Sequence, residues 1–226
     1  LGAGSSIRVD SEGTAQSQGV MFVGSSTFKA DHLTIDVSGS QNHSTSSWII
    51  GTAGIHAEST SGVGEDLVVD LGTGSTINVK SKESTETNPY GVGIYVGGAG
   101  LAHVNADHLT INATSEAPAG GVVGIMSRTA YSFGDTHFVD LGEGSRINII
   151  SKDYGTGIQG YKTDLLASGL EVELNAKSAT GIDLAANSNV NLENSHIHNQ
   201  DATSDSTGIR LDSSTLKASN LIIDGR

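Results

Sequence analysis

Two histidines separated by one residue, His196 and His198, could supply two of the ligands of a metal site. In an extended strand, residues i and i+2 point to the same side, so both imidazoles would lie on one face. Zinc sites need three or four ligands, and no third ligand stands at a fixed spacing from this pair. We therefore expect a pair of surface histidines and no metal site.

A carboxylate beside an imidazole occurs twice, at Asp31-His32 and at Asp107-His108, each time inside the repeated phrase ADHLTI. Acid–base catalysis would also require a nucleophile or a substrate cleft next to these groups. Their place in a repeated strand phrase instead favours a role in a turn or in a stacked ladder.

Asp70 and Asp140 stand before a second repeated phrase, LGxGS, and are expected to accept backbone N–H bonds in that turn. Two acids stacked on neighbouring repeats can lie at the distance of the carboxylate pair of a glycoside hydrolase, so glycoside cleavage stays an alternative. Such sites usually add aromatic platforms and a basic residue, however, and Lys and Arg are sparse. No GxSxG, HExxH, P-loop or EF-hand pattern occurs. We expect no catalytic residues, no cofactor and no enzyme.

The charge balance limits the partners of this chain. Its 226 residues carry 25 acids against 12 scattered bases, a formal net charge of −13, which repels the phosphate backbone of nucleic acids. The absence of cysteine excludes disulfides, thiolate metal sites and a cysteine nucleophile. Nucleic-acid binding is therefore not expected.

Internal repetition is the main structural signal. The phrase VDLGTGSTINV at 69–79 returns 70 residues later as VDLGEGSRINI, and the chain opens on a related phrase, LGAGSSIRV. Between the longer phrases stands a glycine followed by Val or Ile, as in Gly54-Ile55 and Gly93-Ile94. These short phrases alternate with the longer ones along the whole chain.

One aliphatic anchor can be taken from each longer phrase. Consecutive anchors are 25 to 42 residues apart, and apolar and polar residues alternate around them as in strands with one buried face. The anchors are Ile7, Ile35, Ile77, Ile111, Ile147, Val172, Ile197 and Ile223. Strand-only units of this length predict an all-β fold, a β-solenoid of about seven to eight rungs that forms one domain over 1–226. A β-sandwich is the rival fold, but its hairpins should leave more Asn-Gly or Asp-Gly turns than the single Asp224-Gly225.

The rungs differ in their inserts. Polar inserts at 38–47, 80–91 and 114–121 lengthen the first rungs, so we divide the chain into loop-decorated rungs at 1–160 and bare rungs at 161–226. Inserts at one corner of a solenoid often form its binding face, although they can also be neutral sequence variation without a function. The candidate contact residues in or beside inserts are Trp48, Asn42, Lys82, Glu83, Tyr90, Tyr131 and Tyr154. The aromatic members can equally lie flat over corners.

The patterns GIDLAANSNVNLENSHIHN at 181–199 and GIRLDSSTLKASNLIIDG at 208–225 resemble the rungs of a known family. They are similar to the passenger domains of monomeric (type Va) Gram-negative autotransporters, the pertactin-like adhesins. The resemblance implies a right-handed parallel β-helix exported by a C-terminal outer-membrane barrel, which this sequence does not include. Because the chain starts in mid-repeat, we expect it to be a fragment of a longer passenger domain.

An adhesin at the bacterial cell surface is accordingly the first functional hypothesis. It would attach to host cells or matrix, through a surface protein or glycan, or join copies of itself in aggregates and biofilm. The alternative is a β-helix polysaccharide lyase or hydrolase, or a tailspike-like depolymerase, which should gather acids with Lys or Arg on adjacent rungs. A purely structural stalk is the third hypothesis. Fold alone does not choose among them.

Overall fold

The computed structural model describes residues 1–12, 17–39, 51–59, 66–82, 90–118, 120–129, 134–200 and 202–225. These residues form twenty β-strands and no helix. Within the same ranges, accordingly, no helical segment has the length and apolar character needed to cross a bilayer.

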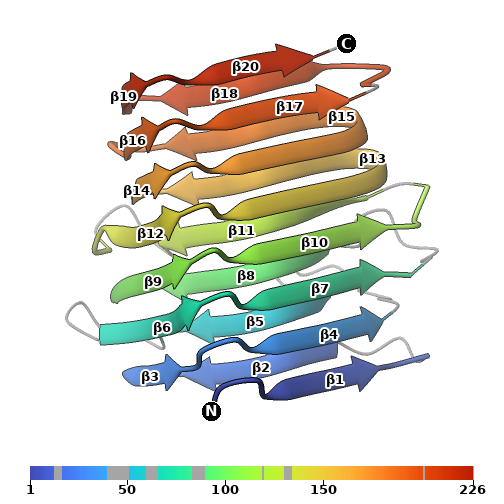
Figure 1. The fold of residues 1–226 in the computed structure, drawn as a ribbon, viewed down its shortest axis with the longest axis vertical. Coiled ribbons are helices and arrows are strands. Elements are labelled where there is room, and N and C mark those ends of the chain that lie inside the picture. Colours follow the sequence, from blue (N-terminus) through green and yellow to red (C-terminus); the bar gives the residue numbers. More distant parts are fainter. Residues whose placement is uncertain are drawn as a thin grey trace.

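The strands lie in three stacks (Figure 1). The front face contains β1 (Ser6–Asp10), β4 (Thr34–Gly39), β7 (Thr76–Ser81), β10 (Thr110–Ser115), β17 (His196–Gln200) and β20 (Ile222–Gly225). The back face contains β2 (Ser17–Val23), β5 (Thr52–Glu58), β8 (Tyr90–Gly98), β11 (Gly121–Thr129) and β18 (Ser206–Asp212). The long strands β13 (Arg146–Tyr161) and β15 (Glu171–Ala185) belong to the front face first and to the back face afterwards. The side sheet contains β3 (Ser26–Lys29), β6 (Asp66–Thr73), β9 (Leu101–Asp107), β12 (His137–Glu143), β14 (Thr163–Ser168), β16 (Asn189–Glu193) and β19 (Thr215–Ser219).

All pairs among the described strands are parallel, and each strand pairs with its equivalents on the neighbouring turns, of which the strands at the two ends have one each. The described strands therefore form a solenoid of seven turns, with β20 starting the next. This confirms the all-β fold of stacked parallel strands and is compatible with a parallel β-helix. It excludes the antiparallel sandwich. The division of the chain at residue 160 stays a prediction.

The eight aliphatic anchors form one continuous column inside the front face. Ile7 pairs with Ile35, and the register continues residue by residue up to the pair of Ile197 and Ile223. From Ile35 to Ile197 every member is at most 1% exposed. The predicted register is confirmed, and it carries the hydrophobic core from one end of the solenoid to the other.

The glycines of the Gly-Ile phrases make a close approach between two faces possible. Ile94 and Ile125 pair inside the back face, so the glycine before each of them lies within a strand. A Cβ on Gly93 would stand 2.5 Å from both the Gly124 carbonyl oxygen and Ile111 Cγ2. These glycines let the back face approach the isoleucine column, and no other side chain fits.

The corner between the side sheet and the front face explains the two longer phrases. One residue at an equivalent place in each turn adopts a left-handed conformation there, with φ between 47° and 67°: His32, Gly74, His108, Gly144, Gly169, Asn194 and Asn220. In the LGxGS turns Gly72 and Gly142, two residues earlier, do so as well. The neighbouring aspartates support the corner, since the Asp31 and Asp107 carboxylates accept the Thr73 and Glu143 N–H groups at 2.8 and 2.7 Å. The phrases ADHL and LGxGS are therefore two sequences for one corner, and the turn role of the Asp-His pairs is confirmed.

Shortening an anchor in the middle of the column should destabilise the protein strongly. We expect Ile111→Ala to lower the free energy of unfolding by about 2–5 kcal/mol, because the rungs above and below keep the cavity open. Urea unfolding followed by circular dichroism measures this. Ile223→Ala is the matched control, because Ile223 is 49% exposed and should lose much less. Equal losses for the two variants would contradict a continuous inner column.

Candidate functional site

The outward side of the front face carries an amide ladder, formed by Asp36, Asn78, Asn112 and Asn148 on successive rungs. Each asparagine donates its side-chain N–H to the residue one rung nearer the N-terminus, at 2.7 Å in all three steps. An amide has two N–H donors and two acceptor lone pairs, so members of the ladder keep hydrogen-bonding capacity for a partner.

A column of threonines runs beside the amide ladder. Thr34, Thr76 and Thr110 pair in register and are half-buried. Toward the C-terminal end the column becomes charged, and the Arg146 guanidinium donates to Glu171, with Nε 2.7 Å from Oε2. On β7 and β10 these two columns are thus an uncharged, regularly spaced array of hydrogen-bonding groups, bordered by the ion pair of Lys80 with Glu116.

The back face contains a groove of about 430 Å³. Its lining includes Met126, Arg128, Gln159 and Tyr161, and also Asp183 and Arg210. Arg210 holds both carboxylate oxygens of Asp183, with Nε 2.7 Å from Oδ1. Acids and arginines therefore converge on adjacent rungs here, beside an exposed tyrosine.

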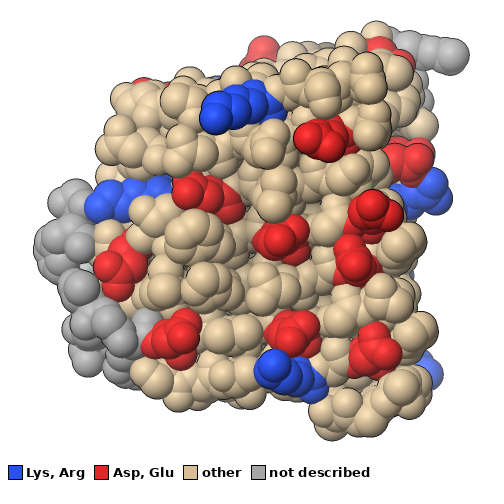
Figure 2. All heavy atoms as spheres, turned by 60° about the vertical axis from the view of Figure 1, so that its left-hand side comes forward, with Lys and Arg blue, Asp and Glu red and all other residues tan. Residues whose placement is uncertain are grey.

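The side sheet has an acidic outer surface. Figure 2 turns this side toward the viewer, and acidic side chains clearly outnumber basic ones on it. A shallow hollow is lined by Asp31, Asp70, Asp107 and Asp140. Asp70 and Asp140 accept the N–H groups of Gly72 and Gly142 at 3.3 and 3.0 Å, which confirms their expected turn role.

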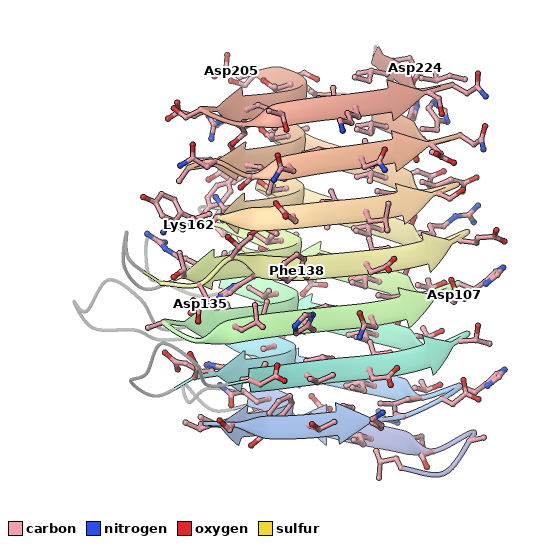
Figure 3. The ribbon with its side chains drawn as sticks, turned by 90° about the vertical axis from the view of Figure 1, so that its left-hand side faces the viewer. Asp107, Asp135, Phe138, Lys162, Asp205 and Asp224 are labelled. Atoms are coloured by element: carbon pink, nitrogen blue, oxygen red, sulfur yellow. The ribbon has the colours of Figure 1, made fainter. Side chains whose placement is uncertain are left out.

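An aromatic pair interrupts the acidic surface. Phe138 projects outward from β12 (Figure 3) and stacks on His103 of the rung before, with ring centroids 5.2 Å apart. Phe138 is 38% exposed. The pair adds a small apolar patch to the side sheet.

One serine–histidine pair, Ser127 and His137, is buried. Thr163 donates to Ser127 Oγ at 2.9 Å, and Ser127 Oγ lies 3.1 Å from His137 Nδ1. His137 Nε2 lies 3.1 Å from the Gly100 carbonyl, which can only accept, so Nε2 carries the proton. Ser127 and His137 are both fully buried, and the chain Thr163–Ser127–His137–Gly100 therefore joins three rungs without offering a nucleophile to a substrate.

Two of the predicted contact residues are described with their side chains. Lys82 Nζ lies 2.8 Å from Asp10 Oδ1 and 3.1 Å from the Ser11 carbonyl, and this ion pair lowers the pKa of Asp10. The ring of Tyr154 lies over Gly121, whose added Cβ would stand 2.4 Å from the ring atoms. Lys82 thus connects rungs, and Tyr154 covers a corner.

The other predicted contact residues cannot be placed at the level of side chains. The backbone of Tyr90 opens β8, and nothing is described of its side chain. Trp48, Asn42, Glu83 and Tyr131 lie outside the described residues. Their role in binding stays a prediction.

His196 and His198 do have a third group beside them. Asp224 of the next rung pairs with His198 in register, and the ligand atoms of the three residues all lie within 4.8 Å of one another. No third ligand was evident at a fixed spacing in the sequence, and the structure supplies Asp224 as a candidate. The spacing contained the signal, because Ile197 and Ile223 were already anchors of successive rungs and Asp224 follows Ile223 directly.

Comparison with known proteins adds no relative. No family model matches the chain, no curated protein matches it, and no solved structure matches it. The functional argument therefore rests on the residues and geometry described above.

The stability of the protein should decrease in mild acid because of His137. Burial lowers the pKa of His137 to about 4, whereas an unfolded histidine titrates near 6.5. Between these values the unfolded state binds more protons, so stability falls with falling pH, by about 3 kcal/mol from this group. Urea unfolding at a series of pH values measures the slope.

His137→Gln should reduce this pH dependence, because glutamine donates and accepts hydrogen bonds without titrating. Burial also lowers the pKa of His56, so part of the slope should remain. The exposed corner residue His32 provides the matched control, His32→Gln, which should keep the slope of the parent chain. If His137→Gln retains the full slope, the buried histidine is not its source.

Proposed function

We propose that this chain is an adhesive segment of a bacterial surface protein, a rod that associates through its front face. In this proposal it is part of the passenger domain of a monomeric Gram-negative autotransporter, displayed outside the cell through a C-terminal outer-membrane barrel. The observation that carries the proposal is the amide ladder with its threonine column. A binding surface repeated rung after rung suits adhesion by many weak contacts better than catalysis at one point.

The proposal includes a right-handed parallel β-helix. In Figure 1 the chain rises from the N-terminus at the bottom, its front strands run to the right, and its back strands return to the left. This path supports the right-handed sense expected for parallel crossover connections.

Charge favours the front face over the side sheet as the contact between copies. The net charge of −13 makes two copies repel each other, most strongly where acids face acids. In the middle of the front face, Thr76, Asn78, Thr110 and Asn112 form an uncharged area, whereas acidic side chains outnumber basic ones on the side sheet (Figure 2). A second copy docked front to front would avoid most of this repulsion.

Loss of the ladder should reduce aggregation of cells that display the protein. We expect the double variant Asn78→Ala/Asn112→Ala to slow settling by about tenfold or more, because each lost hydrogen bond of roughly 1 kcal/mol is multiplied over many displayed copies. Settling of displaying bacteria, mixed with labelled cells that lack the protein, is the measurement.

Asn189→Ala/Asn191→Ala on the side sheet is the matched control, since it removes the same chemistry from another face. It should settle like the parent. Equal slowing in both variants, or co-aggregation of the labelled cells, would refute association of this face with itself.

The back groove supports a second candidate function, binding of a host or bacterial glycan. Tyr161 offers an aromatic platform, with Gln159 and Arg128 as polar neighbours. Asp183 is engaged by Arg210 on both oxygens, which disfavours it as a free catalytic acid and favours binding over cleavage.

Retention on glycan arrays tests this candidate. Tyr161→Ala should abolish retention if the groove binds sugar, while Asn78→Ala/Asn112→Ala should leave it unchanged. Release of shortened oligosaccharides by the parent chain would instead support a depolymerase.

A further inference from the structure

Three metal-ligating side chains meet at the C-terminal end of the front face. β17 directs Ile197 into the core, where it is fully buried, and therefore directs His196 and His198 outward together. β20 pairs with β17 in parallel register and places Asp224 directly opposite His198. Figure 3 shows Asp224 on the last rung, at the right-hand edge where the front face is seen from the side.

The two imidazoles converge on a single carboxylate oxygen. His196 Nε2 lies 3.1 Å from Asp224 Oδ1, and His198 Nδ1 contacts the same oxygen. In a tetrahedral zinc site with bonds near 2.0–2.1 Å, neighbouring ligand atoms lie about 3.3 Å apart. The separation of His196 Nε2 from Asp224 Oδ1 is close to this value, and all three ligand atoms lie within 4.8 Å of one another, so small side-chain shifts would bring them to three corners of such a site.

From this geometry we propose that His196, His198 and Asp224 bind a divalent transition-metal ion of the zinc type. Two imidazole nitrogens and one carboxylate are the donor set that suits Zn²⁺, whereas Ca²⁺ and Mg²⁺ require mainly oxygen ligands. The ion would lie between the three atoms and replace the protons that they otherwise share.

The surroundings favour a cation and leave it accessible. Glu173 stands opposite His198 on the preceding rung, and Glu171 stands opposite His196. Arg146 already engages Glu171, so Glu173 is the acid that adds negative charge beside the site. The side chains of His196, His198 and Asp224 are 43%, 24% and 51% exposed, so the fourth position of the ion faces solvent.

Bound metal would have a mechanical consequence. The ligands come from two rungs, so the ion would join β20 to β17 at the outer surface, opposite the contact of Ile197 with Ile223 inside. Because only the folded arrangement brings the three groups together, binding must stabilise this pair of strands.

Titration of the metal-free 226-residue chain with Zn²⁺ by calorimetry tests the site. We expect one ion per chain, and Co²⁺ in its place should give the strong visible absorption of a tetrahedral complex. His198→Gln and Asp224→Asn should each weaken binding by more than about tenfold, because even the loss of a residue that only hydrogen-bonds to a metal ligand costs about that much. Both substitutions are at the surface, and circular dichroism checks that the variants fold.

His32→Gln is the matched control, because His32 pairs with Asp31 at 2.8 Å and no second histidine of the described residues joins them in a group of metal ligands. It should bind zinc like the parent. Hydrogen exchange gives an independent readout, in which zinc should slow exchange of the β20 amides in the parent and in His32→Gln only. Absence of one-to-one binding in the parent, or unchanged binding in both His198→Gln and Asp224→Asn, would overturn the proposal and leave a hydrogen-bonded histidine–aspartate cluster.

Discussion

Parallel, in-register pairing between successive rungs is the constraint on which the rest of this structure depends. Each residue of a rung lies against its equivalents on the rungs above and below. An inward column therefore keeps one kind of residue over successive rungs, apolar from Ile35 to Ile197 and serine at Ser81, Ser115 and Ser151. Where two faces approach closely, the position must be glycine on every rung, as at Gly93 and Gly124. The repetition in the sequence follows from this stacking.

The same constraint determines what the surface can do. Outward positions also stack, so side chains of one kind form ladders rather than scattered groups. Asn78, Asn112 and Asn148 become an amide ladder on the front face. Near the C-terminal end, the same column contains His198 and Asp224. The stacking that aligns the amides of the ladder therefore also brings the carboxylate of Asp224 to two imidazoles. The adhesive surface and the metal site that we propose are thus two products of one register.

Much of the fold was predictable because the inner columns repeat one residue type. The anchors gave the register of the front face correctly, and the turn role of Asp70 was predicted from its place before LGxGS. The sequence did not reveal that ADHL and LGxGS form the same corner, because the left-handed residue is His32 in one phrase and Gly74 in the other.

The surface sites were harder to predict, for a physical reason. Their members come from different residue types on different rungs, and inserts of unequal length hide which residues become neighbours. The back groove joins Arg128 to Arg210 across several rungs and could not be recognised without the register. The position of Asp224 could have been predicted, since the spacing of Ile197 and Ile223 already implied its place opposite His198.

Single cysteines placed on each face test the central claim most directly, because the chain has no cysteine of its own. Thr110→Cys would stand in the middle of the front face and Asn191→Cys on the side sheet. The measurement is disulfide formation between copies on displaying cells under mild oxidation. The account predicts covalent dimers for Thr110→Cys and none for Asn191→Cys. Dimers formed only through Asn191→Cys, or through neither variant while the cells still aggregate, would contradict it.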